Sequence, residues 1–245
     1  MDTLQDIQFL DRSLRDLCGV SDGARILDFG CGAGGAVKQL QSLGFDAWGC
    51  DNGLFRQGDY QPNEQMLEIT PAPYRLPFDD SFFDAVISTS VMEHAQNKEE
   101  LFREIHRVLK PGATMMHVMP GKYYLPTEPH IYVPFVSWMW PNVPRLWLAL
   151  WAMAGCRNEF QRGLDWQETC SRNVIYCKTG LSYWPHRRFK KVVTAIFGEC
   201  RFADDYYVRN ATGGAARLAR KIPLPHKVTG WLVGRTRMGI LIATK

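Results

Sequence analysis

The sequence lacks the features that mark several classes of protein. No C-x-x-C pair occurs, and the seven cysteines are widely spaced and odd in number. This spacing argues against a zinc site or a disulfide framework and favours a reducing, cytoplasmic location. The amino-terminal residues are acidic and amphipathic rather than basic and then apolar, which argues against a signal peptide.

Long apolar runs are also missing. The stretch of residues 146–154 is apolar and uncharged, but it is much shorter than the roughly 20 residues that a membrane-spanning helix needs. We therefore expect no transmembrane segment. Three interpretations of this stretch stay open: a core helix of a lid, the wall of an apolar substrate pocket, or an interfacial helix. The third implies a peripheral membrane contact through residues 135–155.

The modest net charge of +4 conceals an uneven distribution. Residues 186–245 carry 13 Lys and Arg against 3 Asp and Glu, whereas residues 1–185 carry 16 against 22. A basic carboxy-terminal quarter indicates an acidic partner, such as nucleic acid, anionic lipid or a phosphorylated substrate. A solvated basic face is the simpler alternative.

Short buried runs alternate with helical stripes along the first half of the chain. This alternation predicts an α/β, Rossmann-like doubly wound fold, with a mostly parallel seven-stranded sheet and helices on both faces. In such sheets, ligands bind beyond the carboxyl ends of the strands. The expected strands are residues 25–29, 45–51, 66–70, 82–89, 114–119, 204–209 and 236–244, and the expected helices include 4–17, 36–44, 101–109 and 185–198.

Residues 120–185 interrupt this rhythm with seven prolines and six of the eight tryptophans. We interpret them as an aromatic-rich lid or substrate insertion after the fifth strand. The chain is then a single domain, 1–245, with its core in 20–119 and 186–245. Aromatic side chains with polar edges suit sugar rings, polyketides, quinones or lipid tails.

A glycine-rich turn follows the first expected strand. Glycines allow the backbone to turn sharply and approach a ligand, and the helix that follows presents free N–H groups. The spacing of Gly30, Gly32 and Gly35 fits a dinucleotide fingerprint, in which Asp51 would bind the ribose. An NAD-type oxidoreductase is therefore one candidate.

Asp28, two residues before the first glycine, favours another cofactor. A carboxylate at that place would repel the pyrophosphate of a dinucleotide, but it would attract an ammonium group. S-adenosylmethionine carries a ribose, a sulfonium and an ammonium, and it has no phosphate. The acid therefore favours S-adenosylmethionine over NAD.

The motif ILDFGCGAGG resembles the first motif of class I S-adenosylmethionine-dependent methyltransferases. The resemblance continues in order through residues 48–52, 76–94 and 101–113, which are similar to later blocks of the small-molecule branch of that superfamily. It covers roughly residues 20–120, and it implies a methyltransferase that uses S-adenosyl-L-methionine.

The resemblance also implies where the cofactor lies. It places the methionine in the turn, around Asp28, Gly30, Gly32 and Gly34, with Phe29 and Cys31 also among the cofactor-binding residues. It places the ribose at Asp51 and the adenine beside Asn52 and Leu76. The sulfonium would lie at the end of the fourth strand, at Ser88 and Thr89. In one departure, Ala72 stands where many members have an acid that binds the adenine amino group.

Methyl transfer from a sulfonium requires an aligned acceptor and, when the acceptor is a hydroxyl, a base. Glu128 and His130 follow the fifth strand and lie two apart on an extended segment, so their side chains point the same way. They could form a base with its orienting acid, a two-ligand metal corner, or a lid loop bonded to itself. His94 is a second candidate base or a structural residue. We expect His117 to lie in the core and Glu93 to bind substrate or face solvent.

The acceptor is less constrained. The fourth strand ends without the Asn/Asp-Pro-Pro-Tyr/Phe motif of amino methyltransferases, which favours O-methylation and leaves C-methylation open. The aromatic insertion and basic carboxy-terminal quarter together suggest a small or lipid-linked acceptor that carries an anionic group. We expect no metal and no nucleic-acid partner. A nucleic-acid-binding methyltransferase that uses the basic quarter is the alternative.

Overall fold

The computed structural model describes residues 7–52, 65–69 and 73–245. Its strands are β1 (Arg25–Phe29), β2 (Asp46–Asp51), β3 (Met66–Glu68), β4 (Phe83–Thr89), β5 (Leu109–Pro120), β6 (Arg201–Phe202) and β7 (Met238–Thr244). Its helices are α1 (Ile7–Cys18), α2 (Gly35–Ser42), α3 (Lys98–Val108), α4 (Val136–Met139), α5 (Arg145–Met153), α6 (Trp166–Thr179), α7 (His186–Phe197), α8 (Asp204–Asn210), α9 (Gly214–Arg220) and α10 (His226–Thr236), with a 3-10 turn at Glu159–Gln161.

The strands form one sheet in the order β3-β2-β1-β4-β5-β7-β6. Strands β1 to β5 run parallel, and β7 runs antiparallel to both β5 and β6. The predicted α/β doubly wound fold is therefore confirmed. The carboxyl ends of β1, β2 and β4 meet at one edge, which is where a ligand is expected.

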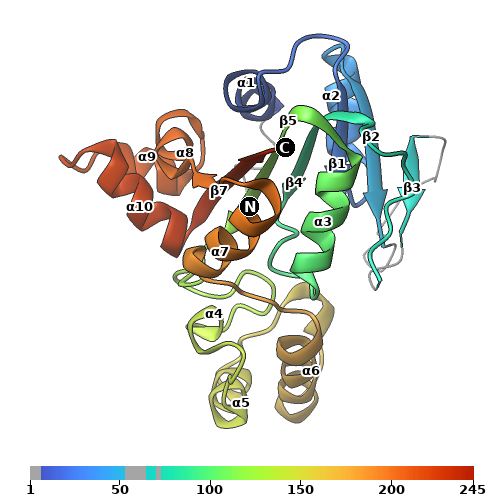
Figure 1. Cartoon of the computed structure of the whole chain (residues 1–245). Coiled ribbons are helices and arrows are strands. Elements are labelled where there is room, and N and C mark those ends of the chain that lie inside the picture. The colour runs from blue at the N-terminus through green and yellow to red at the C-terminus, as the bar shows by residue number, and fades with distance from the viewer. Residues whose placement is uncertain (1–6, 53–64, 70–72) are drawn as a thin grey trace.

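Helices cover both faces of the sheet (Figure 1). Leu14 of α1, Leu40 of α2 and Tyr207 of α8 belong to the apolar cluster on one face. Phe102 of α3 and Val193 of α7 belong to the cluster on the other face. Both faces are buried, so the strands carry unbroken apolar runs rather than alternating ones. This explains why most strand positions were predictable.

One predicted strand is wrong. Residues 204–209, expected as a strand, form α8 instead, and the strand before β7 is Arg201–Phe202. Ala203, Tyr207 and Ala211 are all buried on one side, a spacing of four that suits a helix and not a strand. Asp204 and Asp205 occupy the first turn, where carboxylates interact favourably with the helix dipole.

The insertion between β5 and α7 builds a third apolar cluster of its own. Figure 1 shows α4, α5 and α6 grouped below the sheet. The buried residues Leu148 and Ala152 place one side of α5 in this cluster, as the core-helix interpretation predicts. Leu146, Leu150 and Met153 on the same helix are exposed. Among the described residues, no helix is long and apolar enough to cross a membrane.

The buried face of α8 gives a test of the corrected element. Tyr207 is 1% exposed. Replacing a large buried aromatic by alanine costs about 3 kcal/mol or more, because burial energy is lost and a cavity remains. We expect Tyr207→Ala to lower the free energy of unfolding by that amount in urea titrations. Leu218→Ala, at a site 66% exposed, is the control and should change it by less than about 0.5 kcal/mol. Equal effects would contradict the assigned packing.

Candidate functional site

The glycine turn lies at the ends of β1 and β2. Phe29 pairs with Cys50 in the sheet, and the Gly30 N–H donates to the Cys50 carbonyl at 2.7 Å. Gly30 has a φ of 77°, and a Cβ on it would overlap the Val91 side chain. Glycine is therefore required here for two reasons: its conformation, and the close approach of the loop that follows β4.

Gly34 closes the turn and precedes α2. Its φ is 76°, and a Cβ there would overlap the Met66 sulfur of β3. The first N–H groups of α2 face the edge where the strands end, so this part of the turn has donors available for a ligand.

Two carboxylates flank the turn. Asp28 is buried at the end of β1, and burial, assisted by the negative charge of Asp51, raises its pKa to about 7. The Gly32 N–H donates to Asp51 Oδ2 at 2.9 Å. A cation bound beside Asp28 would favour its ionised form and lower its pKa again. The site therefore has the electrostatics to bind a positively charged group.

The other predicted cofactor residues differ in accessibility. Asn52 and Thr89 are half-buried at strand ends, whereas Phe29, Cys31 and Leu76 lie in the apolar clusters. Ser88 has no accessible surface, and its hydroxyl lies 2.7 Å from His117 Nδ1. The cofactor roles of all these residues stay predictions. Ala72 and its consequence for adenine binding fall outside the described residues.

The candidate base residues lie together. His130 Nδ1 is 2.7 Å from Glu128 Oε1, and His130 Nε2 is 3.3 Å from His94 Nε2. His94 Nδ1 donates to the Gly180 carbonyl at 2.7 Å, so the neutral ring of His94 keeps a lone pair on Nε2. The structure thus joins Glu128, His130 and His94 into one hydrogen-bonded chain.

Glu128 is 1% exposed and is surrounded by donors. Its Oε2 accepts the backbone N–H groups of His130 and Ile131 at 2.8 and 2.9 Å, and Tyr183 donates its hydroxyl to Oε1 at 3.2 Å. With the His130 ring this makes four hydrogen bonds, which is the environment of an ionised carboxylate.

The charges along the Glu128–His130–His94 hydrogen bonds favour one arrangement of protons. Burial lowers the pKa of His130, but the hydrogen bond and charge of Glu128 outweigh it, and the net shift is upward. Burial and the charge of His130 lower the pKa of His94 to about 4. The shared proton therefore belongs to His130, which donates it from Nε2 to His94.

Glu93, expected as a substrate or surface residue, is buried at 3% exposure. Burial raises its pKa to about 7, and its Oε2 has no hydrogen-bond partner among the described residues. Glu93, His94 and His130 each offer a ligand atom, and these atoms lie within 4.8 Å of one another. This set could hold a metal ion, and the contact between the two imidazole rings also suits proton transfer, which is the use that we propose for it.

A buried lysine connects the insertion to the sheet. Lys98 donates to the carbonyls of Ala95 and Ser182 at 2.6 and 2.7 Å and to the Ser182 hydroxyl at 2.7 Å. Burial lowers its pKa to about 7. The Ser182 N–H in turn donates to the Glu93 carbonyl at 2.6 Å. Sequence reasoning missed both Lys98 and Tyr183, since only long-range contacts distinguish them from ordinary residues of their type.

His117 is a core residue, as expected. It is fully buried in β5, and burial lowers its pKa to about 3. Together with Ser88 it forms a buried polar pair between β4 and β5. The neutral ring supports the strand that ends in Thr89 and takes no part in the His94–His130 chain.

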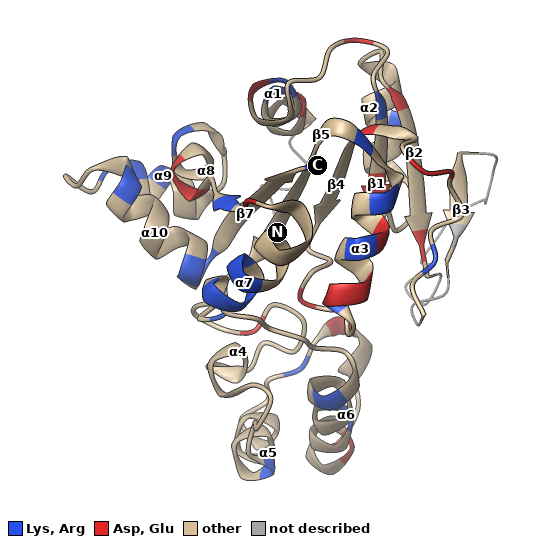
Figure 2. Cartoon of the chain, viewed as in Figure 1, with Lys and Arg blue, Asp and Glu red and all other residues tan. Residues whose placement is uncertain are grey.

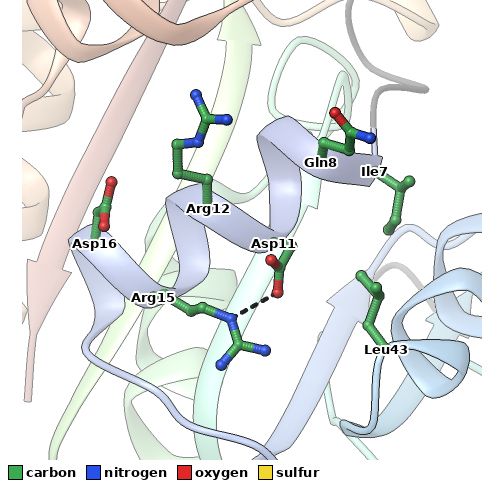
Figure 3. Close-up of a pocket in the computed structure, with 7 residues that line it drawn as sticks. All are labelled: Ile7, Gln8, Asp11, Arg12, Arg15, Asp16 and Leu43. Atoms are coloured by element: carbon green, nitrogen blue, oxygen red, sulfur yellow. Dashed lines mark hydrogen bonds and ion pairs between the residues drawn. The ribbon is translucent and has the colours of Figure 1, made fainter.

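A surface pocket of about 340 Å³ lies elsewhere, along α1 (Figure 3). It includes Arg15, which is paired with Asp11 at 2.8 Å, and Leu43, which follows the carboxyl end of α2. The glycine turn precedes the other end of α2. The pocket therefore lies at the opposite edge of the sheet from the candidate site, and we assign it no role in the chemistry.

Residues 27–116 match the family model described as a methyltransferase domain. Over these residues the chain is similar to methyltransferase domains, as the resemblance of the glycine turn and the later blocks implies. An S-adenosylmethionine-dependent methyltransferase from Mesorhizobium loti shares the fold, with a TM-score of 0.55 over 96% of each chain at 13% identity. The solved structure shows the fold, and the domain match supports a methyltransferase that uses S-adenosylmethionine over the NAD alternative.

Two curated relatives are similar to part of this chain. The 24-methylenesterol C-methyltransferase 2 of Arabidopsis thaliana is 30% identical over 139 residues, which is 48% of this chain and 36% of the relative. The sterol 24-C-methyltransferase of Schizosaccharomyces pombe is 30% identical over 106 residues, 38% of this chain and 27% of the relative. The matching part thus spans about a third of these relatives.

The overlap at Gly30 gives a test of the cofactor turn. We expect Gly30→Ala to weaken S-adenosylmethionine binding about tenfold or more, because it adds backbone strain of ~1–3 kcal/mol and displaces Val91. Gly112→Ala is the matched control: its φ is 79°, but nothing lies within 4 Å of the added Cβ. Calorimetric titration should show unchanged affinity in the control. An equal loss of affinity in both variants would show that the contact with Val91 does not matter for cofactor binding.

Proposed function

We propose that this chain transfers a methyl group from S-adenosylmethionine to a hydroxyl group of a small or lipid-linked acceptor. The observation that carries the proposal is the Glu128–His130–His94 chain beside the cofactor turn. Val91 contacts Gly30, and Glu93 and His94 follow two and three residues later. The loop after β4 therefore reaches the turn at Val91 and the histidines at His94, which supports a donor and an acceptor bound on either side of this loop.

The proposed donor half uses the two carboxylates. Asp28 would pair with the ammonium of the methionine moiety, and Asp51 would accept the ribose hydroxyls. The raised pKa of Asp28 supports this role, because a cation is what would restore its ionised form. Asn52 would lie beside the adenine and Thr89 beside the sulfonium.

The proposed acceptor half uses His130 as the base. A lone pair on the acceptor oxygen attacks the methyl carbon, the carbon–sulfur bond breaks, and its electrons remain on sulfur as neutral S-adenosylhomocysteine. The two histidines act as the base when neither Nε2 atom carries a proton. The hydroxyl proton then passes to His130 Nε2, which shares it with His94 Nε2 across their 3.3 Å contact, and Glu128 stabilises the imidazolium through Nδ1.

C-methylation is the second candidate function. It is supported by the two curated relatives, which are named as sterol C-methyltransferases. In that reaction an alkene attacks the methyl carbon, and the base removes a proton from the resulting carbocation. The same histidine would serve, so product analysis decides between the two: an O-methyl ether supports the first function and a new carbon–methyl bond supports the second.

The basic residues of α7 support an anionic group on the acceptor. Arg187, Arg188 and Lys190 are exposed near the start of that helix, just after the insertion. Arg188 lies over the buried Trp184 ring at 4.0 Å, which fixes its guanidinium at the surface. A cluster of exposed cations just after the insertion suits an acceptor with an anionic group better than a neutral one.

Asp28→Asn tests the donor half. We expect this variant to bind S-adenosylmethionine about tenfold to a hundredfold more weakly, because a hydrogen bond between charged groups is lost. The sharp control is 5′-methylthioadenosine, which lacks the ammonium and should bind both proteins alike. The fold should be retained, since the amide replaces a carboxyl that burial already disfavours as an anion. A parallel loss for both ligands would contradict pairing with the ammonium.

The pH profile tests the acceptor half. Only deprotonated His130 accepts a proton, so turnover should rise with pH through its raised pKa. Glu128→Gln removes the interaction that raises this pKa, so the rising limb should move to lower pH while turnover falls about a hundredfold. Tyr183→Phe, which leaves the carboxylate in place, should move the limb less.

Two outcomes would contradict the base assignment. One is a limb that stays in place in Glu128→Gln. The other is turnover that a chelator abolishes and added Zn²⁺ restores, which would assign Glu93, His94 and His130 to a metal centre.

A further inference from the structure

The connection between α9 and α10 is exposed over its whole length. Residues 221–228 are eight successive exposed residues, and among them are Ile222, Leu224 and Val228. Figure 1 shows the pair of helices projecting from the body of the molecule, with this connection at the far end. An apolar stretch of this kind does not contribute to the core, so its exposure calls for another explanation.

Helix α10 has two distinct faces. Thr229, Gly230 and Val233 are buried against α8, and a Cβ on Gly230 would lie 2.6 Å from the Asp205 nitrogen. On the other face, Trp231 and Leu232 are 53% and 41% exposed. The close packing of the glycine face fixes the helix on the domain. The apolar face therefore points outward in a defined orientation.

We call the exposed apolar surface of α9, α10 and their connection the hairpin face. Its members are Leu218, Ile222, Leu224, Val228, Trp231 and Leu232. These six exposed apolar side chains come from two short helices and the connection between them, which together form one projecting element. Such a surface is typical of a segment that inserts into the boundary of a bilayer.

The charged residues of α9, α10 and their connection are all basic. No Asp or Glu occurs from residue 206 to the end of the chain. Arg217, Lys221 and Lys227 are exposed, and Arg235 lies over the Trp231 ring at 4.2 Å. Among the described residues none of these four forms an ion pair. Figure 2 shows the basic positions on α9 and α10. Unpaired cations around an apolar surface are complementary to anionic headgroups.

We propose that the hairpin face docks on an anionic phospholipid surface, with Ile222, Leu224 and Trp231 in the interface and Arg217, Lys221, Lys227 and Arg235 at the phosphates. A second copy of the chain fits less well, because a symmetric contact would bring like charges together without an acid to offset them. Nucleic acid would match the charge but would leave the aliphatic side chains exposed.

The apolar side of α5 provides a comparison surface. Leu146, Leu150 and Met153 are as exposed as the hairpin residues, but only Arg145 adds a cation within that helix. Docking that depends on charge as well as apolar area should therefore use α10 and not α5. This differs from the expectation that residues 135–155 form the membrane contact.

The test is cosedimentation of the full chain with sucrose-loaded vesicles. We expect binding to phosphatidylcholine vesicles that contain phosphatidylserine, little binding to pure phosphatidylcholine, and release by salt. Two paired substitutions should each weaken binding about tenfold or more: Lys221→Glu with Lys227→Glu, and Leu224→Ala with Trp231→Ala. All four positions are exposed, and circular dichroism verifies that each variant folds.

Two matched variants control for nonspecific effects. Leu146→Ala with Leu150→Ala removes equally exposed apolar area from α5, and Lys38→Glu with Lys178→Glu reverses two exposed charges on α2 and α6. Both should bind within about twofold of the unchanged chain. The proposal is overturned by absent binding to the anionic vesicles or by equal losses in the controls. It is also overturned if light scattering shows a dimer that Leu224→Ala with Trp231→Ala dissociates. None of these readouts depends on methyl transfer.

Discussion

Four donors converge on the buried carboxylate of Glu128, and the geometry of the candidate site follows from that convergence. The backbone N–H groups of His130 and Ile131 fix one oxygen, while Tyr183 and the His130 ring fix the other. A buried carboxylate with fewer partners would lose its charge. Because it is satisfied, it raises the pKa of His130, and the charged His130 in turn helps to keep His94 neutral.

The same site depends on connections between segments far apart in the sequence. His94 follows β4, whereas Glu128 and His130 belong to the insertion. Lys98 joins these parts, since its ammonium is bonded both to the loop after β4 and to Ser182 at the end of the insertion. The absent Cβ of Gly30 then lets Val91 approach the cofactor turn. One lysine and one glycine thus connect the proposed donor and acceptor halves.

The sequence predicts the parts of this structure that repeat a simple pattern. The strands at β1, β2, β4 and β7 were predictable because doubly buried strands need continuous apolar runs. Residues 204–209 were not, because their two tyrosines suit a strand locally and only the sheet behind them selects a helix. The buried state of Glu93 and Lys98 was equally hidden, since charged residues are buried only where distant partners satisfy them.

The uneven charge of the chain takes on a more specific meaning in three dimensions. Some of the basic carboxy-terminal residues have structural partners: Arg220 donates to the Val208 and Ala211 carbonyls, and Lys245 to the Leu109 carbonyl. The cations of α7 lie near the insertion, while those of α9 and α10 surround apolar side chains. One excess of charge therefore separates into three groups, of which the cations on α7 are the ones that the proposed function assigns to the acceptor. A lipid-linked acceptor would connect the cations of α7 with those of the hairpin face, because such a substrate would come from the lipid surface on which the hairpin face is proposed to dock.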